Sequence, residues 1–177
     1  MSIITRRGDD GQTDLMYGGR TPKVSAEVVA CGAVDELNSS LGLVRVSGVA
    51  DQITEQIDTI QGHLVALMGL LSVPADNREK YLADGYPSVG QVDVDWLESI
   101  AVDMPTKFTG WARPGASGNL GAAHMDVART VCRRAELSAW ALGDQSPVLA
   151  CRYLNRLSDI LWLWARKLEA DDGLNEE

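Results

Sequence analysis

Several residue types that build common enzyme sites are scarce in this sequence. It contains two histidines, His63 and His124, a single phenylalanine, and three widely spaced cysteines without a CxxC pair. Because structural zinc sites need four Cys, His or carboxylate ligands, we expect no zinc site. The odd number and wide spacing of the cysteines predict reduced thiols that pack as small hydrophobic residues, and therefore a cytoplasmic protein.

The chain also lacks basic charge and long apolar runs. Its net charge of −9 argues against general nucleic-acid binding, which needs a basic surface, although a local basic pocket for phosphates is compatible with it. No stretch reaches the length of a membrane span, and the first residues have no apolar signal-peptide core, so we expect no membrane association. GxxxxGK[ST] and strand–GxGxxG–helix motifs are absent, which excludes the common nucleotide-binding loops.

What the chain has in quantity is apolar residues at helical spacing. Hydrophobic residues make up 45% of its 177 residues, which fits one domain, 1–177, with a core of its own. Leu, Val and Ala dominate this apolar content and favour helices over sheet. Repeats at intervals of three and four residues predict helices over about 25–45, 51–71, 94–104, 119–142 and 147–170.

This order of elements predicts an all-α fold, an up-and-down four-helix bundle with one short extra helix. Residues 1–24 are rich in glycine and charge, and we expect a structured loop with short strand pieces there. The bundle would occupy 25–170, with 74–92 as a surface excursion and 171–177 as a frayed acidic tail. The apolar seam expected for the fourth helix comprises Leu120, Val127, Val131, Ala135 and Leu142.

Three of the helices carry polar stripes opposite their apolar seams. Solvated stripes usually consist of Lys and Glu in i,i+4 pairs, and that ordinary interpretation stays open. Arg, Asn and Trp are the residues of specific recognition, and their presence favours a buried interface or site. The stripes are Cys31, Asp35, Asn38, Gly42 and Arg45; Asp126, Arg129, Arg133, Glu136 and Trp140; and Arg152, Asn155, Asp159, Trp162 and Arg166.

A second candidate for a functional site is the glycine-containing loop Thr5–Asp14 at the N-terminus. Glycines let backbone N–H groups turn toward an anion, and hydroxyls and arginines add donors. Lys23 follows a few residues beyond Gly18-Gly19. Taken alone, such a loop is more often an ordinary turn. Its pairing with the arginines of the fourth helix is what makes it a candidate phosphate site.

Five segments in order resemble the PduO-type ATP:cob(I)alamin adenosyltransferases. They are TRRGDDGQTDL, GGRTPK, VDELNSSLGL, ARTVCRRAE and NRLSD. The resemblance implies a homotrimeric helical bundle with active sites between subunits. It implies transfer of the 5′-deoxyadenosyl group of ATP to cob(I)alamin, with Mg²⁺ assisting and adenosylcobalamin and triphosphate as products. A cobalamin reductase or flavoprotein would be the electron donor.

The resemblance also implies roles for individual residues. Lys23 would bind the ATP phosphates, and Arg133 and Arg134 would contact the triphosphate. Glu136 would hold the nucleotide side of the pocket, and Asn155 would complete it. The loop residues that would cradle ATP are Thr5, Arg6, Arg7, Gly8, Thr13 and Asp14.

Two further roles concern the junction between subunits and the corrinoid. Asp35 resembles the carboxylate that pairs with an arginine, here Arg129, across the subunit boundary. Trp111 stands where the family usually has Phe, a residue that helps keep the corrinoid's lower axial ligand away. Phe108 is a rival for that position.

The sequence departs from the family pattern at other positions. Asp10 replaces a lysine, Arg7 a threonine, Leu137 an arginine and Cys31 a tyrosine. These departures leave open a catalytically weakened ATP- or corrinoid-binding regulatory protein on the same scaffold. A purely structural helical oligomer is a second alternative, but it leaves the N-terminal loop unexplained.

Overall fold

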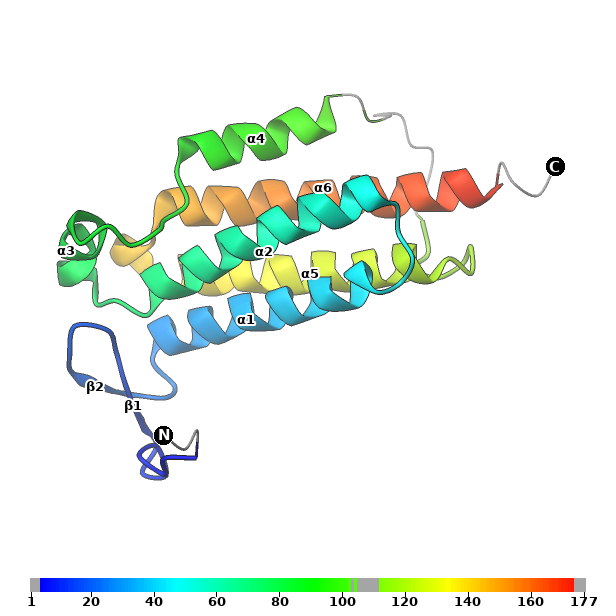
Figure 1. The fold of residues 1–177 in the computed structure, drawn as a ribbon. Helices are drawn as coiled ribbons and strands as arrows, with labels where there is room; N and C mark the ends of the chain where they lie inside the picture. Colours follow the sequence, from blue (N-terminus) through cyan, green and yellow to red (C-terminus); the bar gives the residue numbers. More distant parts are fainter. Residues whose placement is uncertain (1–3, 103, 105–111, 174–177) are drawn as a thin grey trace.

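The fold was analysed in a computed structural model that describes residues 4–102, 104 and 112–173. Within these ranges the chain is mostly helical, with one two-stranded hairpin at its N-terminal end (Figure 1). The elements are β1 Gln12–Asp14, β2 Arg20–Pro22, α1 Ala26–Arg45, α2 Asp51–Leu71, the 3-10 turn Ala75–Asn77, α3 Arg78–Ala83, α4 Gln91–Ala101, α5 Leu120–Trp140, the 3-10 turn Gly143–Gln145 and α6 Val148–Gly173.

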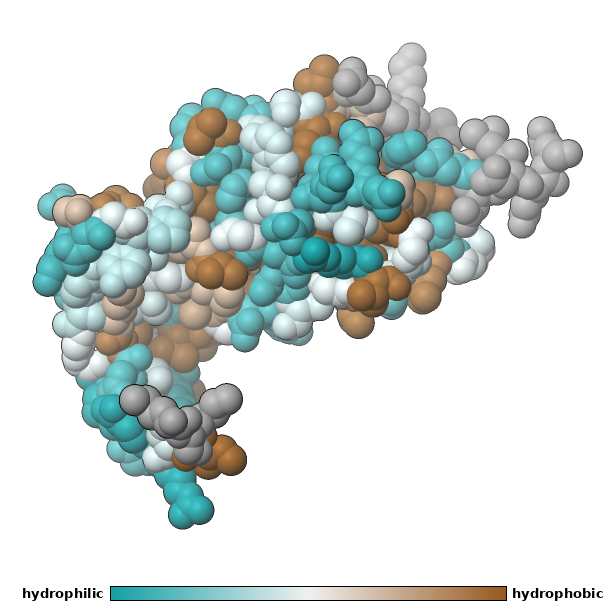
Figure 2. Space-filling view, viewed as in Figure 1, coloured by the Kyte–Doolittle hydropathy of each residue, from teal (hydrophilic) through white to brown (hydrophobic). Residues whose placement is uncertain are grey.

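Four long helices form the body of the molecule. α5 packs against both α6 and α1, α1 packs against α2, and α4 lies along α6 on the outside (Figure 1). The prediction of an all-α, four-helix bundle with a short extra helix is therefore confirmed. The hairpin lies at the end of the bundle where α1 begins, and it forms a mainly hydrophilic lobe (Figure 2).

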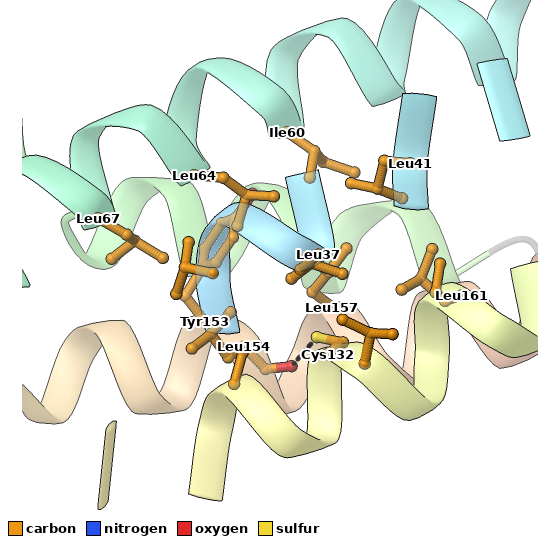
Figure 3. Close-up of a cluster of buried hydrophobic side chains, with 14 of the residues drawn as sticks. Leu37, Leu41, Ile60, Leu64, Leu67, Cys132, Tyr153, Leu154, Leu157 and Leu161 are labelled. Carbon is orange, nitrogen blue, oxygen red and sulfur yellow. Dashed lines mark hydrogen bonds between the residues drawn. The ribbon is translucent and has the colours of Figure 1, made fainter. Parts of the chain in front are cut away.

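The core is built from the apolar seams that the sequence displays. The inward-facing leucines and isoleucines of α1, α2 and α6, such as Leu37, Leu64 and Leu157, interdigitate and are fully buried (Figure 3). Burying such a side chain contributes roughly 2 kcal/mol, so the seams supply the main driving force for folding. Cys132 lies among them, and its thiol donates a hydrogen bond to the carbonyl oxygen of Leu154 at 3.1 Å. Burial raises the pKa of the Cys132 thiol, which is therefore neutral and unreactive.

α5 differs from the prediction in the face that it buries. Leu120 and Val127 were expected in the seam, but their side chains are 59% and 50% exposed. Val131 and Ala135 of the predicted seam are buried, and the rest of the buried face consists of Met125 and small residues such as Ala122, Ala128, Cys132 and Ala139. Small side chains let α5 approach both α1 and α6 closely, and this close approach turns its larger apolar residues outward.

One histidine takes part in the attachment of α4 to the bundle, beside the buried side chains of Val94 and Leu97. His63 of α2 contacts the hydroxyl of Tyr153 through Nδ1 at 3.0 Å and the carboxylate of Asp93 through Nε2 at 3.3 Å. Its ring also meets the rings of Trp96 and Tyr153 edge-on. Asp93 in turn accepts the backbone N–H of Gly90 at the start of α4, at 2.8 Å. His63 thus connects α2, α4 and α6, and these contacts indicate a structural role.

Two segments are more ordered than predicted. The excursion 74–92 contains α3, because Tyr81 buries its ring beside Gly69 of α2, where any side chain would collide with the Tyr81 hydroxyl. α6 runs to Gly173 instead of ending at residue 170, and Lys167 pairs with Asp171 one turn later at 2.9 Å. The helix therefore continues three residues past its predicted end at residue 170.

None of the described helices is, by itself, long and apolar enough to cross a membrane. The pair Asp51–Leu71 and Ala75–Ala83 reaches the threshold of length and composition only when taken together, and it is bent by 111°.

Candidate functional site

The N-terminal hairpin organises the first half of the candidate site. β1 and β2 pair antiparallel with Thr13 opposite Thr21 and Asp14 opposite Arg20. Arg20 reaches across the preceding loop and donates hydrogen bonds to the carbonyl oxygen of Arg7 and to the carboxylate of Asp10, both at 2.8 Å. Asp10 also accepts the backbone N–H of Gln12 at 3.1 Å. The hairpin therefore holds the loop in shape through charge-assisted hydrogen bonds.

The cationic side chains of the loop converge on one hollow. Lys23 lies over Gly8, since a Cβ on Gly8 would sit 2.6 Å from the Lys23 ammonium nitrogen. Arg7 pairs with Asp14 at 2.9 Å. Thr5, Arg7, Gly8, Thr13, Asp14, Arg20 and Lys23 all line a cavity of about 340 Å³. Arg6 is exposed and has a φ of 59°.

A second cavity of about 400 Å³ adjoins the first, because Thr13 and Asp14 line both. Its wall on α1 includes Cys31 and Asp35, and Met68 of α2 completes it. Burial and the nearby charge of Asp35 raise the pKa of the Cys31 thiol, so this thiol is neutral. The cavity is largely apolar, with carboxylates at its margin. It suits an uncharged part of a ligand whose phosphates occupy the first cavity.

The second half of the candidate site lies on α5 and α6. Asn155 donates a hydrogen bond to the Glu136 carboxylate at 3.3 Å, and Arg156 donates to the Asn155 amide oxygen at 2.7 Å. Arg133 is exposed, and within the described residues its guanidinium makes no ion pair or hydrogen bond. Arg134 pairs with Glu36 of α1 at 2.5 Å. The structure thus brings Glu136 and Asn155 together and leaves Arg133 pointing outward.

A buried ionic network supports this helical half. Asp126 is 3% exposed and accepts hydrogen bonds from Arg166 of α6 at 2.6 Å and from Arg129 at 3.1 Å. Arg166 is 7% exposed, pairs with Glu169 and lies 5.8 Å from the Trp162 ring centroid. Within the described residues, Arg129 makes its contact through Nε, toward Asp126, so the two terminal nitrogens of its guanidinium are available to another carboxylate.

The two halves do not meet within one chain. Among the residues that the structure describes, no hydrogen bond or ion pair joins the loop 5–23 to α5, and Asp35 does not pair with Arg129. A cavity of about 460 Å³ lies elsewhere, between α2, α4 and α6, and none of the predicted site residues lines it. Trp111 and Phe108, the candidates for the corrinoid's lower face, fall outside the described residues.

Sequence reasoning missed two parts of this arrangement. Arg20 was not proposed as a site residue, although it stands in the GGRTPK segment directly after two glycines. Asp126 and Arg166 stand on stripes for which a buried interface or site was favoured, but their pairing with each other inside one chain was not foreseen. Only packing reveals it, since α5 and α6 meet on that side.

Comparison with known proteins gives a consistent picture. The family model described as "Cobalamin adenosyltransferase" matches residues 3–168. A cobalamin adenosyltransferase of Cupriavidus metallidurans is 38% identical over 174 residues, which cover 97% of this chain and 90% of that protein. A corrinoid adenosyltransferase of Bacillus subtilis is 35% identical over 182 residues, covering 99% and 91%.

Solved structures resemble the fold over nearly its full length. A variant PduO-type corrinoid adenosyltransferase from Lactobacillus reuteri, complexed with ATP, superposes with a TM-score of 0.81 at 28% identity and covers 95% of this chain and 94% of that one. Another variant of that type from the same organism, complexed with cobalamin and ATP, gives 0.79 at 30% identity, with 93% and 92% covered.

Proposed function

Since the chain belongs to the cobalamin adenosyltransferase family, we propose that it transfers the 5′-deoxyadenosyl group of ATP to cob(I)alamin. The observation that carries the proposal is the cationic hollow formed by Arg7, Arg20 and Lys23 beside a largely apolar cavity on α1. A polyphosphate and an adenosyl group need this combination of neighbouring environments. The identity to relatives named as adenosyltransferases supports the same reaction.

The proposed reaction needs no nucleophile from the protein. The Co(I) centre attacks C5′ of ATP, a cobalt–carbon bond forms, and the C5′–O bond breaks with its electron pair leaving on the triphosphate. The protein's tasks are to hold the reactants in line and to stabilise the departing negative charge. Lys23, Arg7 and Arg133 are the cations suited to that stabilisation. The neutral thiol of Cys31 is consistent with the absence of a protein nucleophile.

We assign the remaining roles by the same proposal. Thr5, Gly8, Thr13 and Asp14 shape the phosphate hollow, Arg6 stands at its margin, and Arg134 lies beside Arg133. Glu136 and Asn155, which already hydrogen-bond to each other, hold the nucleotide from the opposite side. Trp111 excludes the lower axial ligand of the corrinoid.

The chain assembles, in this proposal, as a homotrimer whose active sites lie between subunits. The separation of the two half-sites within one chain supports this arrangement, because a neighbour could bring its α5 to the loop. Asp35 would then meet the free nitrogens of Arg129. Apolar residues around the Glu36–Arg134 pair supply a surface for a second copy: Val29 and Leu43 of α1 and Val127 and Leu137 of α5 are each at least 50% exposed.

Mg²⁺ and an electron donor complete the proposal. Among the described residues no group of three or more His, Cys, Asp or Glu side chains could hold a metal ion. Mg²⁺ commonly binds through substrate phosphates and one or two carboxylates, so it would arrive with ATP. A cobalamin reductase or flavoprotein would supply cob(I)alamin. The free thiols Cys31, Cys132 and Cys151 support a reducing, cytoplasmic location.

The direct test is anaerobic incubation of the protein with ATP, Mg²⁺ and chemically reduced cobalamin. Formation of adenosylcobalamin, followed by its absorption spectrum, is the expected result. Binding of ATP or corrinoid without product would favour the regulatory protein over the enzyme. Failure to bind either ligand would leave only a structural oligomer.

Subunit mixing tests where the site lies. Lys23→Ala inactivates the loop half and Arg133→Ala the helical half, so each variant alone should be inactive. Co-expressed in equal amounts, they should regain about a quarter of wild-type activity, because one interface in four combines two intact halves. A mixture as inactive as its parents would place both halves in one subunit. Light scattering gives the subunit number independently.

A further inference from the structure

The N-terminal hairpin is attached to the bundle at the turn between its strands. Leu15–Gly19 connects β1 to β2 and lies next to α3, whereas the phosphate hollow lies toward the other end of the hairpin (Figure 1). Met16 donates its backbone N–H to the carbonyl oxygen of Ser72 at 2.9 Å. Met16 and Tyr17 also pack on a small apolar cluster of Leu70, Val73 and Tyr81.

Tyr17 makes the polar contacts of this attachment. Its hydroxyl donates a hydrogen bond to the carboxylate of Asp84 at 2.6 Å, a length typical of a charge-assisted bond. The ammonium of Lys80 lies over its ring, 4.7 Å from the centroid. Both partners belong to the elbow that follows α2, defined here as residues 72–84.

The backbone of Tyr17 is held in an unfavourable conformation. Its φ is 64°, in the left-handed region that costs a side-chain-bearing residue about 1 kcal/mol or more. Gly18 and Gly19 follow with φ of 94° and 91°, so three successive residues have positive φ. Such strain persists only where surrounding contacts impose it, and here those contacts come from the elbow.

The turn lies close in the chain to the groups that form the phosphate hollow. Thr13 and Asp14 immediately precede it in β1. Arg20 immediately follows it and holds both the Arg7 carbonyl and Asp10. Lys23, three residues further on, donates its backbone N–H to Gly11 at 2.9 Å. A displacement of the turn would therefore move both strands and, through Arg20, the loop as well.

We infer that Tyr17 is a positioning residue for the ATP loop, which it holds in place by anchoring the hairpin turn to Asp84 and Lys80. The inference rests on the proposed function for the ligand, ATP, but the anchor itself is independent of it. Tyr17 does not line the phosphate hollow. Its effect on ATP is therefore indirect, through the orientation of the hairpin.

The test compares Tyr17→Phe with Tyr86→Phe. Tyr17→Phe keeps the ring for packing and for Lys80 but removes the hydroxyl. Tyr86 lies just beyond the same elbow, stacked on Tyr81 at 4.9 Å, so Tyr86→Phe is the matched control. Tyr17→Phe should raise the KM for ATP about three- to tenfold, which is less than the full value of one hydrogen bond to a charged group because Tyr17 acts on ATP indirectly. Its kcat and the KM for cobalamin should stay within about twofold, and Tyr86→Phe should match wild type throughout.

Hydrogen exchange of the peptide 12–22 gives a readout that does not require activity. Exchange should accelerate in Tyr17→Phe and remain at the wild-type rate in Tyr86→Phe. Faster exchange with an unchanged KM for ATP would overturn the positioning role, and unchanged exchange would overturn the anchor. An equal loss of kcat, both KM values and thermal stability would identify a general folding defect and would also overturn the inference.

The two proposals can fail separately. If the wild-type protein neither binds ATP nor forms adenosylcobalamin, the proposed function is wrong. The hydrogen-exchange comparison still decides whether Tyr17 holds the hairpin.

Discussion

The loop half and the helical half of the candidate site are built in opposite ways. In the loop half, Arg7 pairs with Asp14 and Arg20 with Asp10, in both cases through exposed side chains. On α5, Arg133 is exposed without such a partner in the described structure, and its neighbourhood is supported from below by buried Asp126. The loop is thus assembled by its own chain, whereas the helical half presents an incomplete surface. This division is consistent with the proposed site between two copies.

The buried support of the helical half should show the largest effect on stability. Asp126→Ala would leave the Arg166 guanidinium buried without its main partner, at a cost of about 3–5 kcal/mol. Asp58→Ala breaks an exposed pair with Arg45 and should cost at most about 1 kcal/mol. Denaturant unfolding measures both values. If the two variants lost the same stability, the network on α5 and α6 would not be the support that we describe.

Substitution of Arg133, the exposed arginine of the helical half, should lower activity without lowering stability. Arg133→Ala should lower kcat about 100- to 1,000-fold, as for loss of one preorganised donor to a developing charge. Its thermal midpoint should stay unchanged, because the side chain makes no ion pair within the described chain. Arg45→Ala, an exposed arginine of α1 that pairs with Asp58, is the control and should retain full activity. An active Arg133→Ala enzyme would remove α5 from the site.

A substitution of Gly8 in the loop half should have a smaller effect, on the KM for ATP. A methyl group there would displace the Lys23 ammonium, which is the flexible end of its side chain and can move at little cost in stability. We therefore expect Gly8→Ala to raise the KM for ATP about tenfold with unfolding unaffected. Gly62→Ala on the exposed side of α2, where a methyl group meets open space, is the matched control. A Gly8→Ala variant with wild-type KM would show that Lys23 does not bind ATP.

The smallest effect concerns alkaline pH and the anchor of the hairpin. Desolvation, the hydrogen bond to Asp84 and the Asp84 charge raise the pKa of Tyr17 to about 12. Because the folded pKa lies above the usual value near 10, the stabilisation by Tyr17 is complete below pH 10 and is lost as the pH rises through 12. The stability difference between wild type and Tyr17→Phe should therefore shrink between pH 10 and 12. A phenol that ionises near pH 10, seen as the difference between the two ultraviolet titrations, would contradict this.

Asp10 shows how a departure from the family pattern acquires a physical explanation. Where the family usually has lysine, the Asp10 carboxylate accepts the Gln12 N–H and pairs with Arg20. In this chain the position is therefore used to fold the loop, and Arg20 and Lys23 supply positive charge to the hollow. The departure is thus no evidence by itself for a weakened enzyme.

Most of the fold could be predicted from the sequence, because periodic apolar residues leave few arrangements for four long helices. The seams of α1, α2 and α6 are buried as predicted. The buried face of α5 was harder to predict, since Leu120 and Val127 have the sequence spacing of core residues. Its alanine-rich face is buried because small residues permit closer contact with two neighbours, a preference that no single-helix pattern contains.

The candidate residues themselves were readable from the sequence, because their types and order carry the chemistry of phosphate binding and the resemblance to a known family. The sequence alone identified the glycines at positions 8 and 11, the cations Arg7 and Lys23, and the arginines of the fourth helix. The burial of Asp126 with Arg166 and the attachment of the hairpin through Tyr17 were decided only by tertiary structure. Each of these depends on contacts between residues at least 40 positions apart in the chain, which local spacing does not encode.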